Sequence, residues 1–231
     1  MRVAEEVARL GEEMGRTSAP TLVAVSKKFD ASVVQEVYDA GARVFGENYV
    51  QELVAKAGEL PSDVDWHFIG SLQRNKAKAI AGVPNCSTLQ TLHSIKLANA
   101  LQRALEDPDV GAGRTLNVYI QVNTSGEDSK SGVAPQDVLD LASHVSAQCP
   151  NLALTGLMTI GSKAASLAEG EENPDFVVLN QAASLLREQN LLGENVVISM
   201  GMSADYAQAI RQGSTCVRVG SAIFGARPVP Q

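Results

Sequence analysis

Lys27 is the residue in this sequence whose type and position could do chemistry on a carbonyl group. It follows the apolar segment LVAVS (22–26), so we expect it at the rim of a dry pocket. Desolvation there disfavours the charged ammonium, and a neutral amine is the nucleophile that forms a Schiff base. A lysine at a strand end is more often solvated or salt-bridged, so this position alone leaves both interpretations open. Lys28 is adjacent, but strand alternation directs it to the opposite side.

The C-terminal stretch SMGMSADYAQAIRQGSTCVRVGSAIFG (199–225) has features of an anion site. Ser203 is placed to cap a short helix that begins near Ala204, and Gly220 and Ser221 directly follow an apolar run. Loops after parallel strands often hold phosphate through hydroxyl and backbone N–H donors. Glycine and serine are also ordinary turn residues, so turn chemistry alone is the alternative interpretation.

Arg218 interrupts the apolar segment CVRVG (216–220). A guanidinium buried in such a segment needs a partner. One partner would be Glu47, a carboxylate at the end of another expected strand. The other would be an acceptor on a bound ring.

The elements that must position these residues follow a repeating pattern. An amphipathic N-terminal helix, with Val3, Val7, Leu10 and Met14 on one face, comes first. Short apolar runs of β-type composition then alternate with segments of helical period, two of which open at Pro135 and Pro174. The expected strands are 21–28, 42–48, 64–71, 85–91, 115–124, 152–160, 195–201 and 215–225.

Strict alternation of strand and helix predicts an α/β fold with a parallel sheet. Eight such units in 231 residues predict one domain, residues 1–231, folded as a single (β/α)8 TIM barrel with an extra N-terminal helix. A doubly wound open sheet is the alternative, but its strands tolerate Ser, Thr, His and Gln poorly. The polar stretches 125–132 and 162–173 are expected to be surface loops.

Functional residues of such a barrel lie at the C-terminal ends of the strands. In this sequence those positions are Ser26, Lys27, Asn48, Gly70, Ser71, Gln90, Asn123, Met158, Ser199 to Ser203 and Arg218 to Ser221.

Composition excludes several other classes of protein. The net charge is −7 with no basic stripe, which disfavours nucleic-acid or anionic-membrane binding. The three cysteines are far apart, and the three histidines show no metal-ligand spacing, so we expect neither a disulfide framework nor a metal site. No apolar run approaches a membrane span. The default location is the cytoplasm, with a mitochondrial location as the alternative.

Six ordered segments together resemble the pyridoxal phosphate homeostasis protein family. They are AVSK (24–27), FGENYVQE (45–52), WHFIGSLQRNK (66–76), IQVNTSGEDSKSG (120–132), GLMTI (156–160) and SMGMSADYAQAIRQGSTCVRVGSAIFGAR (199–227). As a set covering nearly the whole chain, they are far more specific than any one of them alone.

The resemblance implies a barrel similar to the N-terminal domain of alanine racemases, with pyridoxal 5'-phosphate (PLP) as the cofactor. It implies an internal aldimine on Lys27 and an arginine, Arg218, facing the pyridine nitrogen. The remaining cofactor-binding residues that it implies, as phosphate contacts or pocket lining, are Asn48, Met158, Ser199, Met202, Ser203, Gly220 and Ser221.

The function that the resemblance implies is PLP (vitamin B6) homeostasis: a monomer that holds the cofactor without catalytic turnover and passes it transiently to PLP-dependent apo-enzymes. Arginine can only donate to the ring nitrogen, which weakens the ring as an electron sink. Because the eighth expected strand lies close to Gln231, we also expect no second domain of the kind found in alanine racemases. An amino-acid racemase with the same cofactor is the first alternative, and a Schiff-base aldolase without it is the second.

One segment departs from the family pattern. Many relatives continue with a basic residue and a proline after the lysine, whereas this chain reads SKKFD, with Phe29 and Asp30. Asp30 would serve as a helix N-cap. Lys130, in the loop after the fifth strand, is expected to be solvated, with transient contact to the cofactor as a hypothesis.

Overall fold

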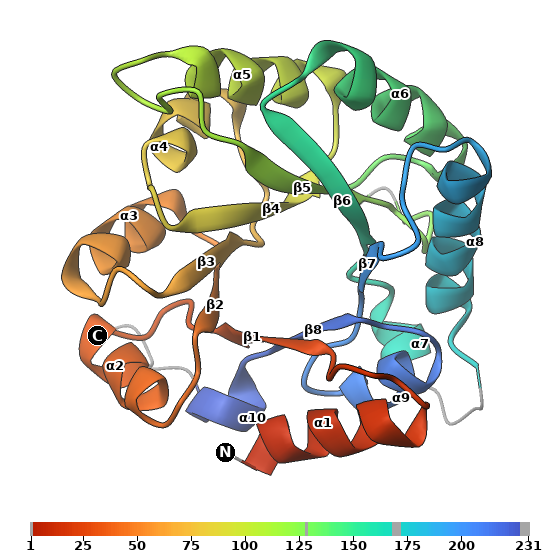
Figure 1. The fold of residues 1–231 in the computed structure, drawn as a ribbon. Coiled ribbons are helices and arrows are strands. Elements are labelled where there is room, and N and C mark those ends of the chain that lie inside the picture. Colours follow the sequence, from red (N-terminus) through yellow and green to blue (C-terminus); the bar gives the residue numbers. More distant parts are fainter. Residues whose placement is uncertain (1, 128, 168–171, 227–231) are drawn as a thin grey trace.

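A closed ring of eight parallel strands in sequence order forms the centre of the protein (Figure 1). The computed structural model describes residues 2–127, 129–167 and 172–226. The strands are β1 (Thr21–Val25), β2 (Val44–Glu47), β3 (Asp65–Phe68), β4 (Cys86–Leu92), β5 (Leu116–Gln121), β6 (Leu152–Met158), β7 (Val197–Ser199) and β8 (Cys216–Val219).

Helices alternate with these strands and surround the ring (Figure 1). They are α1 (Arg2–Glu13), α2 (Ala31–Asp39), α3 (Val50–Glu59), α4 (Ala77–Ala81), α5 (Ile95–Glu106), α6 (Val138–Gln148), α7 (Lys163–Leu167), α8 (Pro174–Glu188), α9 (Tyr206–Arg211) and α10 (Ser221–Phe224), with 3-10 turns η1 (Arg74–Lys76) and η2 (Pro135–Asp137). Within the described ranges, no helix is long and apolar enough to cross a membrane.

The predicted (β/α)8 barrel is confirmed, and the alternative of an open sheet is wrong. β1 pairs with β8 in parallel from Thr21 opposite Cys216 to Ala24 opposite Val219, which closes the ring. Helix starts at Pro135 and Pro174 are also confirmed. Asp30 occupies the N-cap position of α2, although its side chain makes no capping hydrogen bond.

Three local expectations are wrong. The segment 215–225 is not one strand, because β8 stops at Val219 and α10 follows, with Phe224 stacked on Phe29 at 5.1 Å between ring centroids. The expected loop 162–173 contains α7, and its residues 168–171 lie outside the described part of the chain. Met14 lies beyond the end of α1 and is 46% exposed, so it does not share the buried face.

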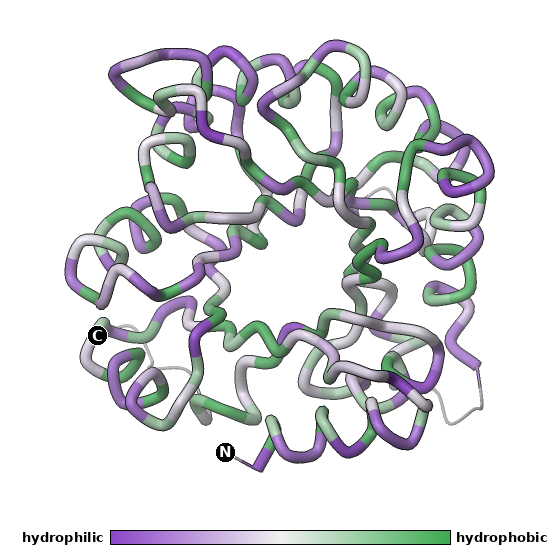
Figure 2. The backbone as a smooth tube through the Cα atoms, in the orientation of Figure 1, coloured by the Kyte–Doolittle hydropathy of each residue, from purple (hydrophilic) through white to green (hydrophobic). Residues whose placement is uncertain are grey.

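Apolar side chains fill the layer between the barrel and its helices. Phe45 of β2 and Trp66 of β3 are both fully buried there, with ring centroids 5.8 Å apart. A second cluster joins Val3, Val7 and Leu10 of α1 to α9 and β8, so α1 covers the outside of the closing strand pair. Figure 2 shows hydrophobic and hydrophilic residues alternating along the surrounding helices, as this one-sided burial requires.

Phe45→Ala should lower the free energy of unfolding by about 3–5 kcal/mol, because a large aromatic ring leaves a cavity against Trp66. The measurement is a urea titration followed by the emission of Trp66, which is the single tryptophan of the chain. Met14→Ala is the control and should leave the midpoint nearly unchanged, because that side chain is exposed. Equal midpoints for both variants would contradict this account of the core.

Candidate functional site

The predicted site residues gather at the end of the barrel where the strands finish. Lys27 is the second residue after β1, and Asn48 directly follows β2. Met158 and Ser199 are the last residues of β6 and β7 and lie opposite each other in the register. Because all eight strands are parallel and the ring is closed, these positions share one mouth.

Arg218 is almost completely buried inside the barrel, with 4% of its surface exposed. Its Nη1 donates to Oγ of Ser199 at 2.5 Å, and its Nη2 donates to the carbonyl oxygen of Thr159 at 2.7 Å. Burial lowers the pKa of this guanidinium below its ordinary value. Arginine nevertheless stays protonated in proteins, so a positive charge lies at the mouth of the barrel, hydrogen-bonded to neutral oxygens and within electrostatic reach of the Asp205 carboxylate.

The suggested pairing of Arg218 with Glu47 is wrong. Glu47 instead forms an ion pair with Lys56 of α3, with Nζ 2.6 Å from Oε1. Strand alternation explains the difference. Glu47 lies on the same face of β2 as Phe45, toward the helices, whereas Arg218 reaches side chains inside the ring.

A row of hydrogen-bonded side chains inside the barrel fixes the orientation of Arg218. Ser199 donates from Oγ to Oε1 of Gln90 at 2.6 Å, while it accepts from Arg218. Nε2 of Gln90 lies 2.8 Å from Nδ1 of His67, and all four residues belong to different strands. Because each of these side chains is hydrogen-bonded to the next, the guanidinium is held in one orientation.

The loop between β7 and α9 lies beside the end of β8. Oγ of Ser203 accepts from the backbone N–H of Gly220 at 3.3 Å, so the loop between β7 and α9 touches the residue that follows β8. Asp205 stabilises the first loop by accepting from the N–H of Met202 at 2.6 Å. The expectation that Ser203 caps the following helix is wrong, because α9 begins at Tyr206 and Asp205 takes the N-cap position.

A glycine is required in this loop. Gly201 has a φ of +95°, and a Cβ built on it would lie 2.5 Å from Cβ of Ala209. A larger residue would push the Ser203 loop away from α9. Ser221, the remaining predicted phosphate contact, is exposed and is the first residue of α10.

The end of β1 borders this loop. Gly220 lies against β1, since an added Cβ would be in ordinary contact with the carbonyl oxygen of Val25, 3.4 Å away. Lys27 is half-buried two residues further along the chain. The structure therefore brings the turn of Lys27 next to the loops of Gly220 and Ser203.

Asn48 carries a buried polar atom that lacks a partner. Its Oδ1 is buried and makes no hydrogen bond with the described residues. The backbone here is also tightly packed, since a Cβ on Gly70 would lie 2.0 Å from the carbonyl oxygen of Asn48. Buried polar groups are normally paired, so an unpaired amide at the mouth indicates a position for a ligand.

The described residues offer no metal site. No group of three or more His, Cys, Asp or Glu side chains gathers within them. The cysteines Cys86, Cys149 and Cys216 are all buried and free, and burial raises the pKa of the Cys86 thiol to about 12. Such a thiol is a poor nucleophile at neutral pH.

Lys130 is not the solvated residue that we expected. The residue is half-buried, and its Nζ donates to the carbonyl oxygen of Gly161 at 3.0 Å. The loop after β5 is thereby tied to the loop after β6. Whether Lys130 also contacts a cofactor stays a hypothesis.

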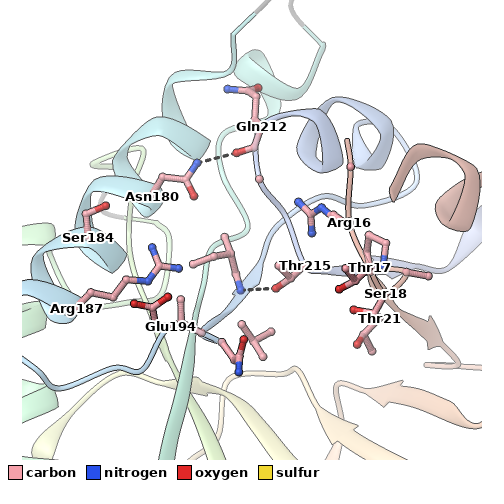
Figure 3. Close-up of a pocket in the computed structure, with 18 residues that line it drawn as sticks. Arg16, Thr17, Ser18, Thr21, Asn180, Ser184, Arg187, Glu194, Gln212 and Thr215 are labelled. Atoms are coloured by element: carbon pink, nitrogen blue, oxygen red, sulfur yellow. Dashed lines mark hydrogen bonds between the residues drawn. The ribbon is translucent and has the colours of Figure 1, made fainter. Parts of the chain in front are cut away.

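A cavity of about 860 Å³ opens at the opposite end of the barrel (Figure 3). Its walls include Thr21 and Val197, the first residues of β1 and β7. Arg16 and Arg187 approach it from opposite walls, but none of its charged side chains is buried. Functional chemistry in this fold occurs at the carboxyl ends of the strands, so this cavity is not the candidate site.

Sequence reasoning missed several residues that support the site. Lys56 and Glu52 lie one helical turn apart on α3, and that spacing was the available signal for an ion pair. Thr159 contributes through its backbone carbonyl, which no sequence pattern marks. Asp205 follows Ser203 in a stretch that we interpreted as a helix start.

Comparisons with known proteins show the family to which this chain belongs. Residues 2–228 match the family described as "Alanine racemase, N-terminal domain". The chain is 44% identical over 232 residues to the "Pyridoxal phosphate homeostasis protein" of Homo sapiens, covering 98% of this chain and 83% of that one. It is 50% identical over 210 residues to the protein of that name from Schizosaccharomyces pombe, covering 90% and 84%.

A solved structure of similar fold carries a ligand. PipY of Synechococcus elongatus PCC7942, with PLP bound, superposes with a TM-score of 0.73 at 31% sequence identity. The match covers 95% of this chain and 100% of PipY.

Ser199→Ala should lower the free energy of unfolding by about 1–3 kcal/mol, because Arg218 and Gln90 each lose a buried hydrogen-bond partner. A urea titration of both proteins measures the difference. Ser18→Ala, at an exposed serine, is the matched control and should change little. A Ser199→Ala variant as stable as the control would mean that the hydrogen bonds of Ser199 inside the barrel do not hold Arg218.

Proposed function

This chain belongs to the alanine racemase N-terminal domain family, together with the pyridoxal phosphate homeostasis proteins, and we propose that it binds PLP at the mouth of its barrel. One observation carries the proposal. The turn of Lys27, the loops of Ser203 and Gly220, and the buried guanidinium of Arg218 converge at one end of the ring. These three features match the aldehyde, the phosphate and the pyridine nitrogen of PLP.

The residues present fit this cofactor. Ser203 and Gly220 would hold the phosphate with Ser221, through hydroxyl and N–H donors of the type that bind phosphate elsewhere. Arg218 would donate to the pyridine nitrogen, which is a neutral acceptor. The unpaired Oδ1 of Asn48 can only accept, so its partner would be a donor such as the ring hydroxyl of PLP.

Other predicted residues would line the pocket rather than bind through charge. Met158 is fully buried beside Ser199, and Met202 is half-buried in the loop that Asp205 stabilises. Lys27 would supply the amine that holds the aldehyde carbon of the cofactor.

Arg218 also limits the chemistry of this site. Bound PLP supplies an electron sink, whose strength depends on protonation of its ring nitrogen. Arg218 can only donate a hydrogen bond, so it would keep that nitrogen unprotonated. A weaker electron sink disfavours transaminase-like chemistry and is compatible with racemisation or with no turnover. The names of the relatives support our inference that the site holds PLP without turning over amino acids.

The function that the site supports best is therefore PLP homeostasis. The protein would hold PLP reversibly and pass it transiently to apo-enzymes that need it. A racemase, the alternative, is supported by the description of the family, but the residues that we assign to the site include no second acid or base to act with Lys27 from the opposite face of the cofactor.

Lys27→Ala should abolish the visible absorbance that PLP acquires when a lysine holds it. Wild type, Lys27→Ala and Lys28→Ala are each incubated with PLP and desalted, and the spectra are compared. Wild type and Lys28→Ala should keep the band, because only Lys27 faces the mouth in this proposal.

Two results would contradict the assignment. A wild type that stays colourless would exclude PLP as the cofactor and favour an aldolase-like site. A full band in Lys27→Ala would show that another lysine is the anchor.

Ser203→Ala should weaken PLP binding about tenfold, since one hydrogen bond to a charged phosphate is lost. Equilibrium titration of the visible band measures the dissociation constant. Pyridoxal, which lacks the phosphate, is the matched control and should bind both proteins alike. An equal loss for PLP and pyridoxal would place Ser203 away from the phosphate.

A further inference from the structure

Three charged side chains are packed behind the turn that carries Lys27. Glu47 of β2 is fully buried and Lys56 of α3 is 5% exposed. Nζ of Lys56 lies 2.6 Å from Oε1 of Glu47 and 2.9 Å from Oε2 of Glu52, one turn earlier on the helix. We call Glu47, Glu52 and Lys56 the clamp.

The clamp holds the chain on both sides of Lys27. Lys56 donates from Nζ to the carbonyl oxygen of Ser26 at 3.0 Å, and the hydroxyl of Ser26 donates to Glu47 at 2.7 Å. On the other side, the backbone N–H of Lys28 donates to Oε2 of Glu52 at 2.8 Å. Lys27 is therefore the central residue of a turn whose two neighbours are both bonded to the clamp.

The turn has a conformation that needs such support. Lys28 has a φ of +68°, in the left-handed region that residues with a side chain rarely adopt. The N–H of Phe29 closes the turn on the carbonyl oxygen of Ser26 at 3.1 Å. Without the contacts of Glu52 and Lys56, Lys28 would relax toward negative φ, and the two lysine side chains would rotate together.

Stability alone is a poor explanation for the clamp. Burial raises the pKa of Glu47 above its ordinary value, while the hydrogen bond from Lys56 opposes the rise. Oε2 of Glu47 is buried without a partner in the described residues. Replacing a buried ion pair by apolar packing is often neutral or stabilising, so we look for the role of the clamp in the geometry that it imposes.

We propose that the clamp selects Lys27 over the adjacent Lys28 as the residue that receives PLP, by fixing the turn so that only Lys27 faces the mouth. Glu47, Glu52 and Lys56 are then positioning residues that do not touch the cofactor. The inference rests on the proposed function, and it explains how a chain with two neighbouring amines presents one of them.

The test compares which lysine becomes labelled. Wild type, Lys56→Met and Glu52→Ala are incubated with PLP and reduced with sodium borohydride, and the pyridoxyl group is located by peptide mass spectrometry. We expect the ratio of label on Lys27 to label on Lys28 to fall about tenfold in both variants, the effect of one lost hydrogen bond to a charged group. Glu52 is partly exposed, so Glu52→Ala decides the test if Lys56→Met does not fold.

Two controls separate positioning from general destabilisation. Glu52→Gln keeps a side-chain oxygen that can accept from the N–H of Lys28, and it should keep the ratio near that of wild type. Leu186→Ala removes a fully buried side chain on α8, and it should lower stability without changing the ratio.

The outcomes are distinct. An unchanged ratio in Glu52→Ala, and in Lys56→Met where it folds, would overturn the inference while leaving PLP binding intact. A shifted ratio in Leu186→Ala would also overturn it. Wild type without label on Lys27 would instead overturn the proposed function.

Discussion

The pairing of β1 with β8 is the constraint on which the site depends. It joins the first and last strands of the chain in register, from Thr21 opposite Cys216 to Ala24 opposite Val219. Lys27 comes from the start of the sequence, and Arg218 and Gly220 come from its end. Only closure of the ring places them at one mouth, and α1 covers that joint with Val3, Val7 and Leu10.

Because side chains alternate between the two faces of a strand, the polar residues form two separate groups, one inside the ring and one between the strands and the helices. Inside the ring, Arg218 donates to neutral oxygens and Ser199 links it to Gln90, with the carboxylate of Asp205 near enough to favour the charged guanidinium. In the layer between strands and helices, Glu47 and Lys56 form an ion pair, and both bond to Ser26, Lys56 through its backbone carbonyl and Glu47 through its hydroxyl. One group would face the cofactor and the other would orient the residue that holds it.

Most of the architecture could be predicted from the sequence because it repeats. Eight alternations of β-type and helical segments define a barrel, and strand ends such as Asn48 and Met158 then follow. Local errors arose where composition is ambiguous. The apolar residues after Val219 are compatible with a strand or a helix. They form the helix α10, in which Phe224 stacks on Phe29, a residue far away in the sequence.

The support of the site was less predictable than its contact residues. In the sequence, nothing distinguishes Lys56 from an ordinary surface residue of an amphipathic helix, whereas the fold buries it against Glu47. The left-handed turn at Lys28 has no glycine to mark it. Both features depend on long-range contacts, and a single sequence does not specify which distant groups will meet.

The most direct test of the account is a crystal structure of the protein grown with PLP. The account predicts continuous density from Nζ of Lys27 to the cofactor, with the phosphate between Ser203 and Gly220 and the ring nitrogen facing Arg218. Density for PLP on another lysine, or with its phosphate away from those loops, would contradict it.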